Sequence, residues 1–221
     1  MAIYDNPKIV TNGLVLCLDA GNRKSYPGSG TAWTDLSGLG NNGTLTNGPT
    51  FNANNAGSIV FDGTNDQVET SFMPPVGQSP RTICMWVNPT IAQNKNLLGY
   101  GSNVSRQLWD ILMYQGNIGV HLYGTAATAG ISHTIGSWQH IVFAYSHPTI
   151  QSYGNGIAVS SYSDVNINTG TDNTLYIGTG VYYNAYKNCA AAITNVQIYN
   201  RALSAAEVEQ NFNATRKRFG I

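Results

Sequence analysis

Short apolar runs recur along the whole chain, and clusters of Gly, Asn, Asp and Pro separate them. Runs of this length, rich in Val, Ile, Tyr and Trp, predict β-strands rather than helices. Because the runs follow one another without a linker, we expect an all-β fold in which two antiparallel sheets form a sandwich. The runs are GLVLCLD, GSIVFDG, RTICMWVNP, NLLGYG, QLWDILMYQ, NIGVHLYG, SWQHIVFAYS, GIAVSSYS, NTLYIGTG and AITNVQIYN.

Two intervals between these runs contain the residues of tight hairpin turns. Gln115-Gly116-Asn117 separates one pair of strand runs, and Gly154-Asn155-Gly156 separates another. Gly and Asn tolerate the positive φ angles that such turns require. We therefore expect hairpins at both places.

The stretch from Gly21 to Asn55 is rich in Gly, Asn, Ser and Thr, and it is long for a loop. A loop of that size in a compact domain is usually either ordered for a function or packed over a sheet. We expect packing over a sheet, because apolar anchors occur along the stretch: Trp33, Leu36, Leu45 and Phe51.

One helix is predicted after the last strand run. Ser204 and Glu207 have the spacing of a capping box, in which each side chain satisfies a backbone amide. The helix should begin near Ala205, and Val208 and Phe212 should then lie on one face, against the sandwich. We expect a single domain over residues 1–221, with an N-terminal arm at 1–12 and this helix and a tail at 204–221.

The charge balance narrows the choice of partners. Eleven basic and eleven acidic residues cancel, so the chain lacks the long-range field that gathers nucleic acid or anionic membranes. No run approaches the ~20 apolar residues of a membrane span, and the first residues, MAIYDNPKIV, do not resemble a secretory signal. We expect no nucleic-acid partner and no membrane. The basic cluster Arg216, Lys217 and Arg218 is interpreted as a solvated tail.

Three cysteines, Cys17, Cys84 and Cys189, stand far apart, each in an apolar, strand-like setting. A thiol in such a setting behaves as a small apolar side chain. An odd number at wide spacing also argues against a disulfide framework. We expect free buried thiols and assembly in a reducing cytoplasm.

Several stretches, in order and over nearly the whole chain, resemble the laminin-G-like, concanavalin A-like jellyroll superfamily in the version common in phage virion proteins. They are GLVLCLDAGNRKSYPGSGTAWTDLSGLGNNGTLTNGPTF, GSIVFDGTNDQVE, RTICMWVNP, GSWQHIVFAY, YGNGIAV and VQIYNRALSAAEVEQNF. The resemblance implies a two-sheet antiparallel jellyroll sandwich with a short C-terminal helix. This scaffold serves as lectin, adhesion module, virion component and, in some branches, glycan hydrolase, so the fold alone does not choose a function. The segment KNCAAAITNV departs from the family, which more often has an aromatic residue and a Gly before the last strand.

The stretch SIVFDGTNDQVET brings three carboxylates together: Asp62, Asp66 and Glu69. Asp and Asn side chains cap nearby amides in turns, and Gly63 can take a positive φ. The spacing differs from that of an EF-hand loop, whose ligands alternate ahead of the Gly. We interpret Asp62 and Asp66 as organisers of a turn, with a weak calcium site as the alternative.

Asp110, in QLWDILMY, is the acid whose position most resembles the calcium-binding rim of related domains. Calcium takes roughly six to eight oxygen ligands, and no second acidic ligand stands near Asp110 in the sequence. We interpret Asp110 as a solvent-facing strand residue, with a calcium ligand as the alternative. No cofactor is expected beyond that option.

A hydrolytic site is not expected. Glycoside hydrolysis needs two carboxyl groups flanking the scissile bond, and in the hydrolase branch the resemblance calls for an E-x-D-x-x-E segment, which the chain lacks. Glu207 and Glu209 belong to the expected helix.

The histidines lack metal-ligand spacing and are interpreted as ordinary polar or core residues: His121, His133, His140 and His147.

The stretch GVYYNAYKN places three tyrosines with Asn and Lys in one loop. Aromatic faces cover the CH surfaces of sugars, while amide and hydroxyl groups bond the sugar hydroxyls. Tyrosine is also enriched at protein interfaces. Tyr182, Tyr183, Tyr186 and Asn184 are therefore candidates for contact with a glycan or a protein partner, with local packing as the third interpretation.

The resemblance and the absence of a catalytic carboxylate pair predict a non-enzymatic phage virion structural protein, a decoration or appendage domain on the exterior of capsid or tail. Its partners would be other virion proteins, and its location the virion, assembled in the host cytoplasm. Such a role is compatible with a homo-oligomer. The alternative is a carbohydrate-binding adhesion module that recognises host or environmental glycans, with or without calcium.

Overall fold

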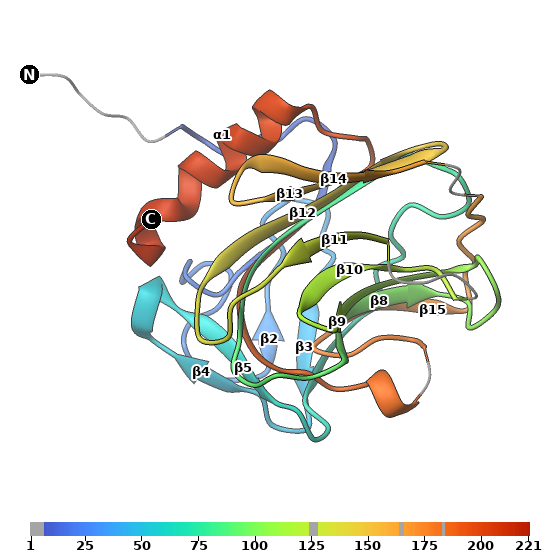
Figure 1. Cartoon of the computed structure of the whole chain (residues 1–221). Helices are drawn as coiled ribbons and strands as arrows, with labels where there is room; N and C mark the ends of the chain where they lie inside the picture. The colour runs from blue at the N-terminus through green and yellow to red at the C-terminus, as the bar shows by residue number, and fades with distance from the viewer. Residues whose placement is uncertain (1–6, 124–127, 164–165, 183) are drawn as a thin grey trace, which may run out of the picture.

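The computed structural model describes residues 7–123, 128–163, 166–182 and 184–221. Two antiparallel sheets of eight strands each face one another across a shared apolar core (Figure 1). A short helix, α1 (Ala205–Thr215), follows the last strand. The predicted all-β sandwich with a C-terminal helix is confirmed.

Sheet A has the strand order β14-β13-β12-β7-β16-β5-β4, and β1 also pairs with β16. β16 is the longest strand, and it pairs with β7 along one edge and with β5 and β1 along the other. The strands of sheet A are β1 (Leu14–Asp19), β4 (Thr50–Asn52), β5 (Ser58–Asp62), β7 (Arg81–Pro89), β12 (Gln139–Ser146), β13 (Thr149–Gly154), β14 (Ile157–Tyr162) and β16 (Ala190–Tyr199).

Sheet B has the order β11-β10-β9-β8-β15-β6-β3-β2. On strand β9, which lies between β10 and β8, Trp109, Ile111 and Met113 point into the core. The residues between them, Asp110 among these, therefore belong to the outer face. The strands of sheet B are β2 (Ala32–Trp33), β3 (Gly43–Thr46), β6 (Gln67–Thr70), β8 (Lys95–Gly101), β9 (Leu108–Tyr114), β10 (Asn117–His121), β11 (Thr128–Ser132) and β15 (Asn173–Ile177).

The stretch from Gly21 to Asn55 contributes more than the expected loop. It adds β2 and β3 to the edge of sheet B and β4 to the edge of sheet A. Trp33 and Leu45 are buried in the core as anchors, as the sequence predicts. These strands have between two and four residues, too few to give a clear alternation of apolar and polar positions.

Both predicted hairpins are present. Gln115 and Gly116 have φ angles of 49° and 80°, and Asn155 and Gly156 have 49° and 82°. Two consecutive positive φ angles define the turn type whose twist matches that of the flanking strands. The first turn joins β9 to β10, as expected. The second turn joins β14 to β13, a strand that is absent from the ten predicted runs, rather than to β12.

Helix α1 begins at Ala205 with the predicted capping box, formed by Ser204 and Glu207. The helix lies along the outer side of sheet A, near β12, β13 and β14 (Figure 1). Val208 is fully buried there, in a second, smaller core with residues such as Cys84 and Val142. The prediction that this helix covers the sandwich is confirmed.

The interpretation of the basic cluster as a solvated tail is wrong for Arg218. Its guanidinium donates to both carboxylate oxygens of Asp19, at 2.8 and 2.9 Å. The neighbouring Phe219 stacks on Trp86 with the ring centres 4.0 Å apart. Residues Arg216–Phe219 form a 3-10 helix, η3, in which Arg216 and Lys217 are exposed.

The three cysteines are free and buried, as predicted. Burial raises the pKa of each thiol to about 12.

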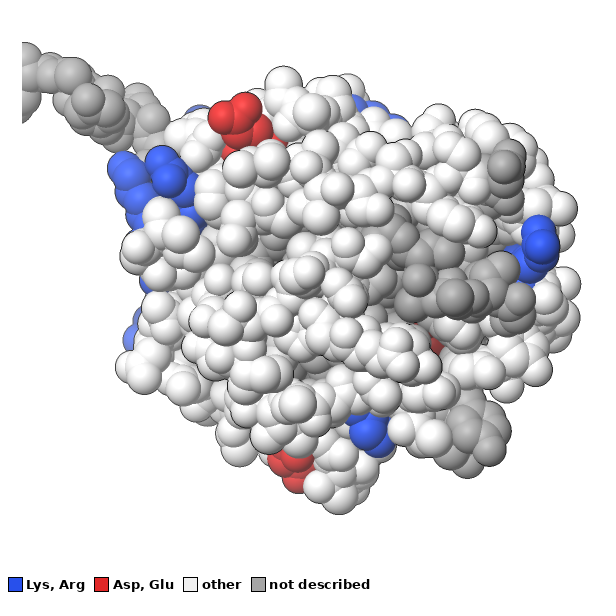
Figure 2. Space-filling view, viewed as in Figure 1, with Lys and Arg blue, Asp and Glu red and all other residues white. Residues whose placement is uncertain are grey.

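Charged side chains are sparse on the face shown in Figure 2 and lie mostly toward its periphery. Within the described ranges, no helix has the length and apolar character that crossing a bilayer requires.

Candidate functional site

The loop between β15 and β16 folds back over the outer face of sheet B. Its ends meet, because Cys189 N–H donates to Gly178 O at 2.8 Å and Asn188 N–H donates to Thr179 Oγ1 at 3.2 Å. A 3-10 turn, η2 (Asn184–Tyr186), lies within the loop and contacts β8. In Figure 1 this turn, drawn in orange, lies at lower right, on the opposite side of the molecule from α1.

Asp110 lies beneath this loop and is fully buried. The interpretation of Asp110 as a solvent-facing residue is therefore wrong. Its Oδ1 accepts a hydrogen bond from Val181 N–H at 3.1 Å, and its Oδ2 accepts one from Tyr182 N–H at 3.0 Å. Burial raises the pKa of Asp110 to about 7, although the two amide hydrogen bonds and the charge of Lys187 act to lower it.

Two glycines allow the loop to approach the sheet this closely. Gly99 pairs directly with Asp110 across β8 and β9, and a Cβ at Gly99 would overlap Asp110 Oδ1. A Cβ at Gly180, in the loop, would overlap the side chain of Asn96 on β8. Gly at both positions thus makes room for the contact between Asp110 and the loop.

Four tyrosines gather where the loop meets the ends of β9 and β10, and we call them the tyrosine patch: Tyr114, Tyr123, Tyr182 and Tyr186. The ring centre of Tyr182 is 4.8 Å from that of Tyr123. Tyr182 also stacks on Tyr186, with the ring centres 5.9 Å apart and an angle of 12° between the ring planes. Tyr114 meets Tyr186 edge-on at 6.5 Å. All four side chains are half-buried, so part of the patch faces solvent.

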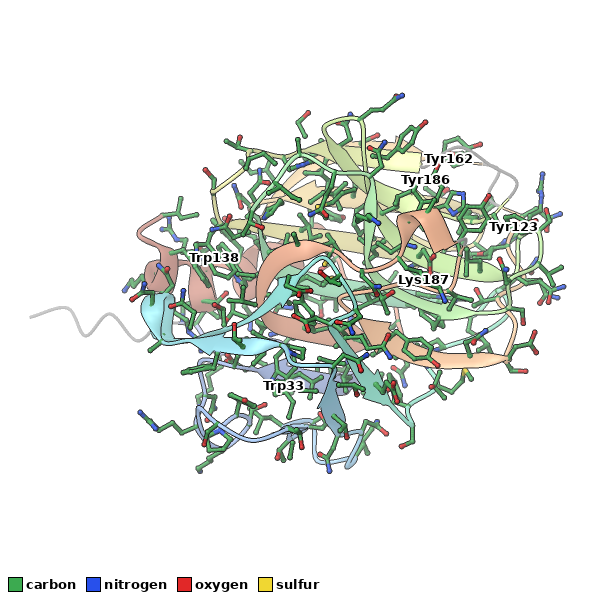
Figure 3. All side chains as sticks on the ribbon, turned by 90° about the horizontal axis from the view of Figure 1, so that it is seen from below. Trp33, Tyr123, Trp138, Tyr162, Tyr186 and Lys187 are labelled. Atoms are coloured by element: carbon green, nitrogen blue, oxygen red, sulfur yellow. The ribbon has the colours of Figure 1, made fainter. Side chains whose placement is uncertain are left out.

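A pocket of about 190 Å³ lies on the same face, beside the patch. Glu69 on β6 accepts a hydrogen bond from the Gln67 amide at 2.6 Å. Figure 3 shows Lys187 on the same side of the molecule as Tyr123 and Tyr186, with Trp138 on the opposite side. We call this hollow the polar pocket; its lining is Gln67, Glu69, Asn173, Tyr176, Thr179, Gly180, Val181 and Lys187.

His121 joins the patch to Asp110. It pairs with Asp110 across β9 and β10, and its ring lies 4.4 Å from that of Tyr182. Burial lowers the pKa of His121, which favours the neutral ring. The row Gly99–Asp110–His121 therefore forms the floor beneath Tyr182.

The three neighbouring carboxylates have separate roles. Asp62 accepts from Thr64 N–H at 2.7 Å and Asp66 accepts from Asp62 N–H at 3.0 Å, around Gly63 with φ 83°. The Thr64 amide lowers the pKa of Asp62, whereas burial raises that of Asp66. The two aspartates organise a turn, which carries the chain from β5 in sheet A to β6 in sheet B. Glu69 instead lines the polar pocket.

The tyrosine loop was found from its sequence, but much of the site was not. Tyr183 lies outside the described residues, as does the side chain of Asn184. Sequence reasoning missed the contributions from β6, β9 and β10, because they come together only when sheet B forms. The available signal was the alternation on these strands, where the outward positions carry polar or aromatic residues: Gln67, Glu69, Tyr114 and His121.

Metal ligands do not gather in the described part of the chain: no three His, Cys, Asp or Glu side chains form a group that could hold an ion. His140 lies on sheet A, 5.3 Å from Trp86 and 5.9 Å from Phe212. Burial lowers the pKa of His140 to about 3, so the ring is neutral. It packs between strand and helix, as the sequence predicts.

Several solved structures share this fold. The binding domain of Paraclostridial Mosquitocidal Protein 1 matches 92% of the chain with a TM-score of 0.69 and 19% identity. A Trypanosoma rangeli sialidase mutant with trans-sialidase activity matches 96% (TM-score 0.69, 20% identity), and the botulinum neurotoxin serotype G binding domain matches 90% (TM-score 0.68, 17% identity). The chain spans 52%, 34% and 50% of those structures, respectively.

At these identities the structural likeness establishes the fold alone. A comparison with curated protein sequences finds no match. The family profile described as the concanavalin A-like lectin/glucanases superfamily, laminin-G type, matches residues 62–209. This match covers most of the sandwich, from the end of β5 into α1. The chain belongs to the concanavalin A-like lectin/glucanases superfamily.

Proposed function

We propose that this chain is a non-enzymatic carbohydrate-binding domain whose site is the tyrosine patch together with the polar pocket. The observation that carries this proposal is that one loop supplies both surfaces: Tyr182 and Tyr186 to the patch, and Val181 and Lys187 to the pocket. A sugar ring has apolar CH faces and a rim of hydroxyl groups. An aromatic surface beside a polar hollow matches both.

The polar pocket has the chemistry to orient a sugar. The Glu69 carboxylate and the Gln67 and Asn173 amides can accept or donate hydrogen bonds, and Lys187 can donate them. Lys187 makes no hydrogen bond or ion pair with another residue in the described ranges. Its ammonium group is thus available to a ligand hydroxyl or acid group.

The number and position of the carboxylates at the site favour binding over hydrolysis. Among the described residues that line the pocket, Glu69 is the one carboxylate. Asp110 lies behind the backbone of Val181 and Tyr182, where a substrate cannot reach it. Glycoside hydrolysis needs a pair of carboxyl groups beside the bond that breaks. The toxin binding domains of similar fold lend support by analogy only.

A glycan array probed with the purified protein tests the proposal. Wild type should bind a subset of the glycans on the array. The binding signal on these glycans should fall at least about tenfold for Tyr182→Ala and for Glu69→Gln. Tyr162→Ala is the matched control, because Tyr162 is an exposed tyrosine on β14 of sheet A. Unchanged binding by both site variants would refute this site. An array with no bound glycan at millimolar concentrations would refute the function.

As the setting for this domain, we propose the exterior of a phage virion, assembled in the host cytoplasm with other virion proteins as partners. The order of the phage-type sequence stretches and the three free, buried cysteines support it, because free thiols are typical of reducing compartments. Mass spectrometry and cryo-electron microscopy of purified particles provide the test. Absence of the chain from the particles would contradict the virion setting without affecting the glycan site.

A further inference from the structure

We propose that Asp110 is a positioning residue, whose buried carboxylate fixes the tyrosine patch by binding the backbone of the loop that carries Tyr182. The importance of this role for ligand binding rests on the proposed function. The hold on the loop does not, because it follows from the contacts alone.

Both carboxylate oxygens of Asp110 are used by the loop. Each accepts from one of two consecutive amides, Val181 N–H and Tyr182 N–H. A single acceptor would leave the loop free to rotate about one contact, whereas two adjacent contacts fix the direction of the backbone. The backbone of Tyr182 is thereby fixed relative to β9.

The ring of Tyr182 is set from the same row of sheet B. His121 pairs with Asp110 across the strands and contacts the Tyr182 ring at 4.4 Å. Tyr182 in turn contacts Tyr123 and Tyr186. Displacement of the Tyr182 backbone would therefore move the centre of the patch.

Asn96, a polar residue beside the floor, does not hold the loop by hydrogen bonds. Asn96 is fully buried against Gly180, and its amide oxygen and nitrogen have no hydrogen-bond partner among the described residues. Gly99 contributes by leaving space, since a methyl group there would overlap Asp110 Oδ1. Two substitutions of different chemistry, at Asp110 and at Gly99, can therefore disturb the same contact.

Amide hydrogen exchange of Val181 and Tyr182, followed by NMR, tests the hold directly. Asp110→Asn keeps one acceptor oxygen, so we expect exchange at these amides to rise about tenfold, and further in Asp110→Ala. Gly99→Ala should change exchange in the same direction without removing a polar group. Asp35→Asn is the matched control, because Asp35 is also a buried acceptor of backbone amides, from Cys17, Ser37 and Asn41, in another loop.

Unchanged exchange at Val181 and Tyr182 in both Asp110→Asn and Gly99→Ala would overturn the proposal. So would an equal rise throughout the strands, which would indicate general destabilisation. The glycan array, run with the same variants, should show at least a fivefold loss of signal for Asp110→Asn and none for Asp35→Asn. If wild type binds no glycan, the proposed function fails, while the exchange data still decide the role of Asp110.

Discussion

The guanidinium of Arg81 lies against the ring of Trp109 in the core, with its central carbon 5.1 Å from the ring centre. Tyr145 contacts the same group at 5.2 Å. The guanidinium also donates to Tyr100 Oη at 3.0 Å and to Thr169 Oγ1 at 2.8 Å. Arg81 is fully buried, so a charged side chain joins both sheets and the connection before β15.

Replacing Arg81 with Met should lower the free energy of unfolding by about 3 kcal/mol. The change removes several buried hydrogen bonds, including one to Gly77 O at 2.7 Å, and leaves acceptors unpaired. Urea denaturation at neutral pH measures the effect. Arg23→Met, at an exposed arginine with one hydrogen bond to Pro27 O, should cost less than about 0.5 kcal/mol. Equal costs for the two variants would show that burial of Arg81 is unimportant.

The buried carboxyl of Asp110 should make stability depend on pH. Because burial raises its pKa to about 7 in the folded protein, against about 3.9 when unfolded, folding binds a proton. This contribution is complete below the unfolded pKa and is lost as pH rises to 7. We therefore compare the free energy of unfolding of wild type with that of Asp110→Asn at each pH. The difference, wild type minus variant, should be about 3 kcal/mol larger at pH 5 than at pH 8.

Denaturation curves of both proteins at the two pH values measure this difference. His121 and Lys187, which lie near Asp110, are present in both proteins, so their own titration largely cancels. A difference that does not vary with pH would show that Asp110 ionises normally in the folded state.

Phe219→Ala should weaken the attachment of η3 to sheet A. Phe219 stacks on Trp86 at 4.0 Å and contacts Trp138 at 4.9 Å, and such aromatic pairs are worth about 1 kcal/mol. We expect a loss of about that size and a red shift of tryptophan emission. Ile221→Ala, at an exposed apolar residue beyond the contact, should change neither, and identical spectra for all three proteins would argue against the stack.

Calcium should have little effect on stability if Asp62 and Asp66 only organise a turn. Asp62→Ala should lower the melting temperature, because Thr64 N–H loses its acceptor. Millimolar calcium should change the melting temperature of neither wild type nor Asp62→Ala. A ligand that binds only the folded state would raise the melting temperature. A rise in calcium, relative to chelator, seen in wild type and absent from Asp62→Ala would instead identify a calcium site.

The strands of the core were predictable because their apolar residues are contiguous in sequence. All ten apolar runs are strands, from β1 to β16. The strands that escaped prediction are short or polar, such as β6 and β13, and their partners rather than their own residues define them. The site was predictable only in part for a related reason. Tyr182 and Tyr186 share one loop, but Tyr114 and Glu69 reach it through strand pairing, and Tyr123 reaches it from the segment just after β10.

The central place of β16 in sheet A has a consequence for synthesis on the ribosome. β7, β5 and β1 are made early, but each depends on β16 for a neighbour, and β16 is the last strand of the described chain to emerge. Until then, the core-facing side chains of those strands have an incomplete sheet around them. Strands β7, β12, β13 and β14 can pair with one another before β16 emerges, as can β4 and β5. We therefore expect β16 to join these two parts of sheet A, and to add β1, in a late step.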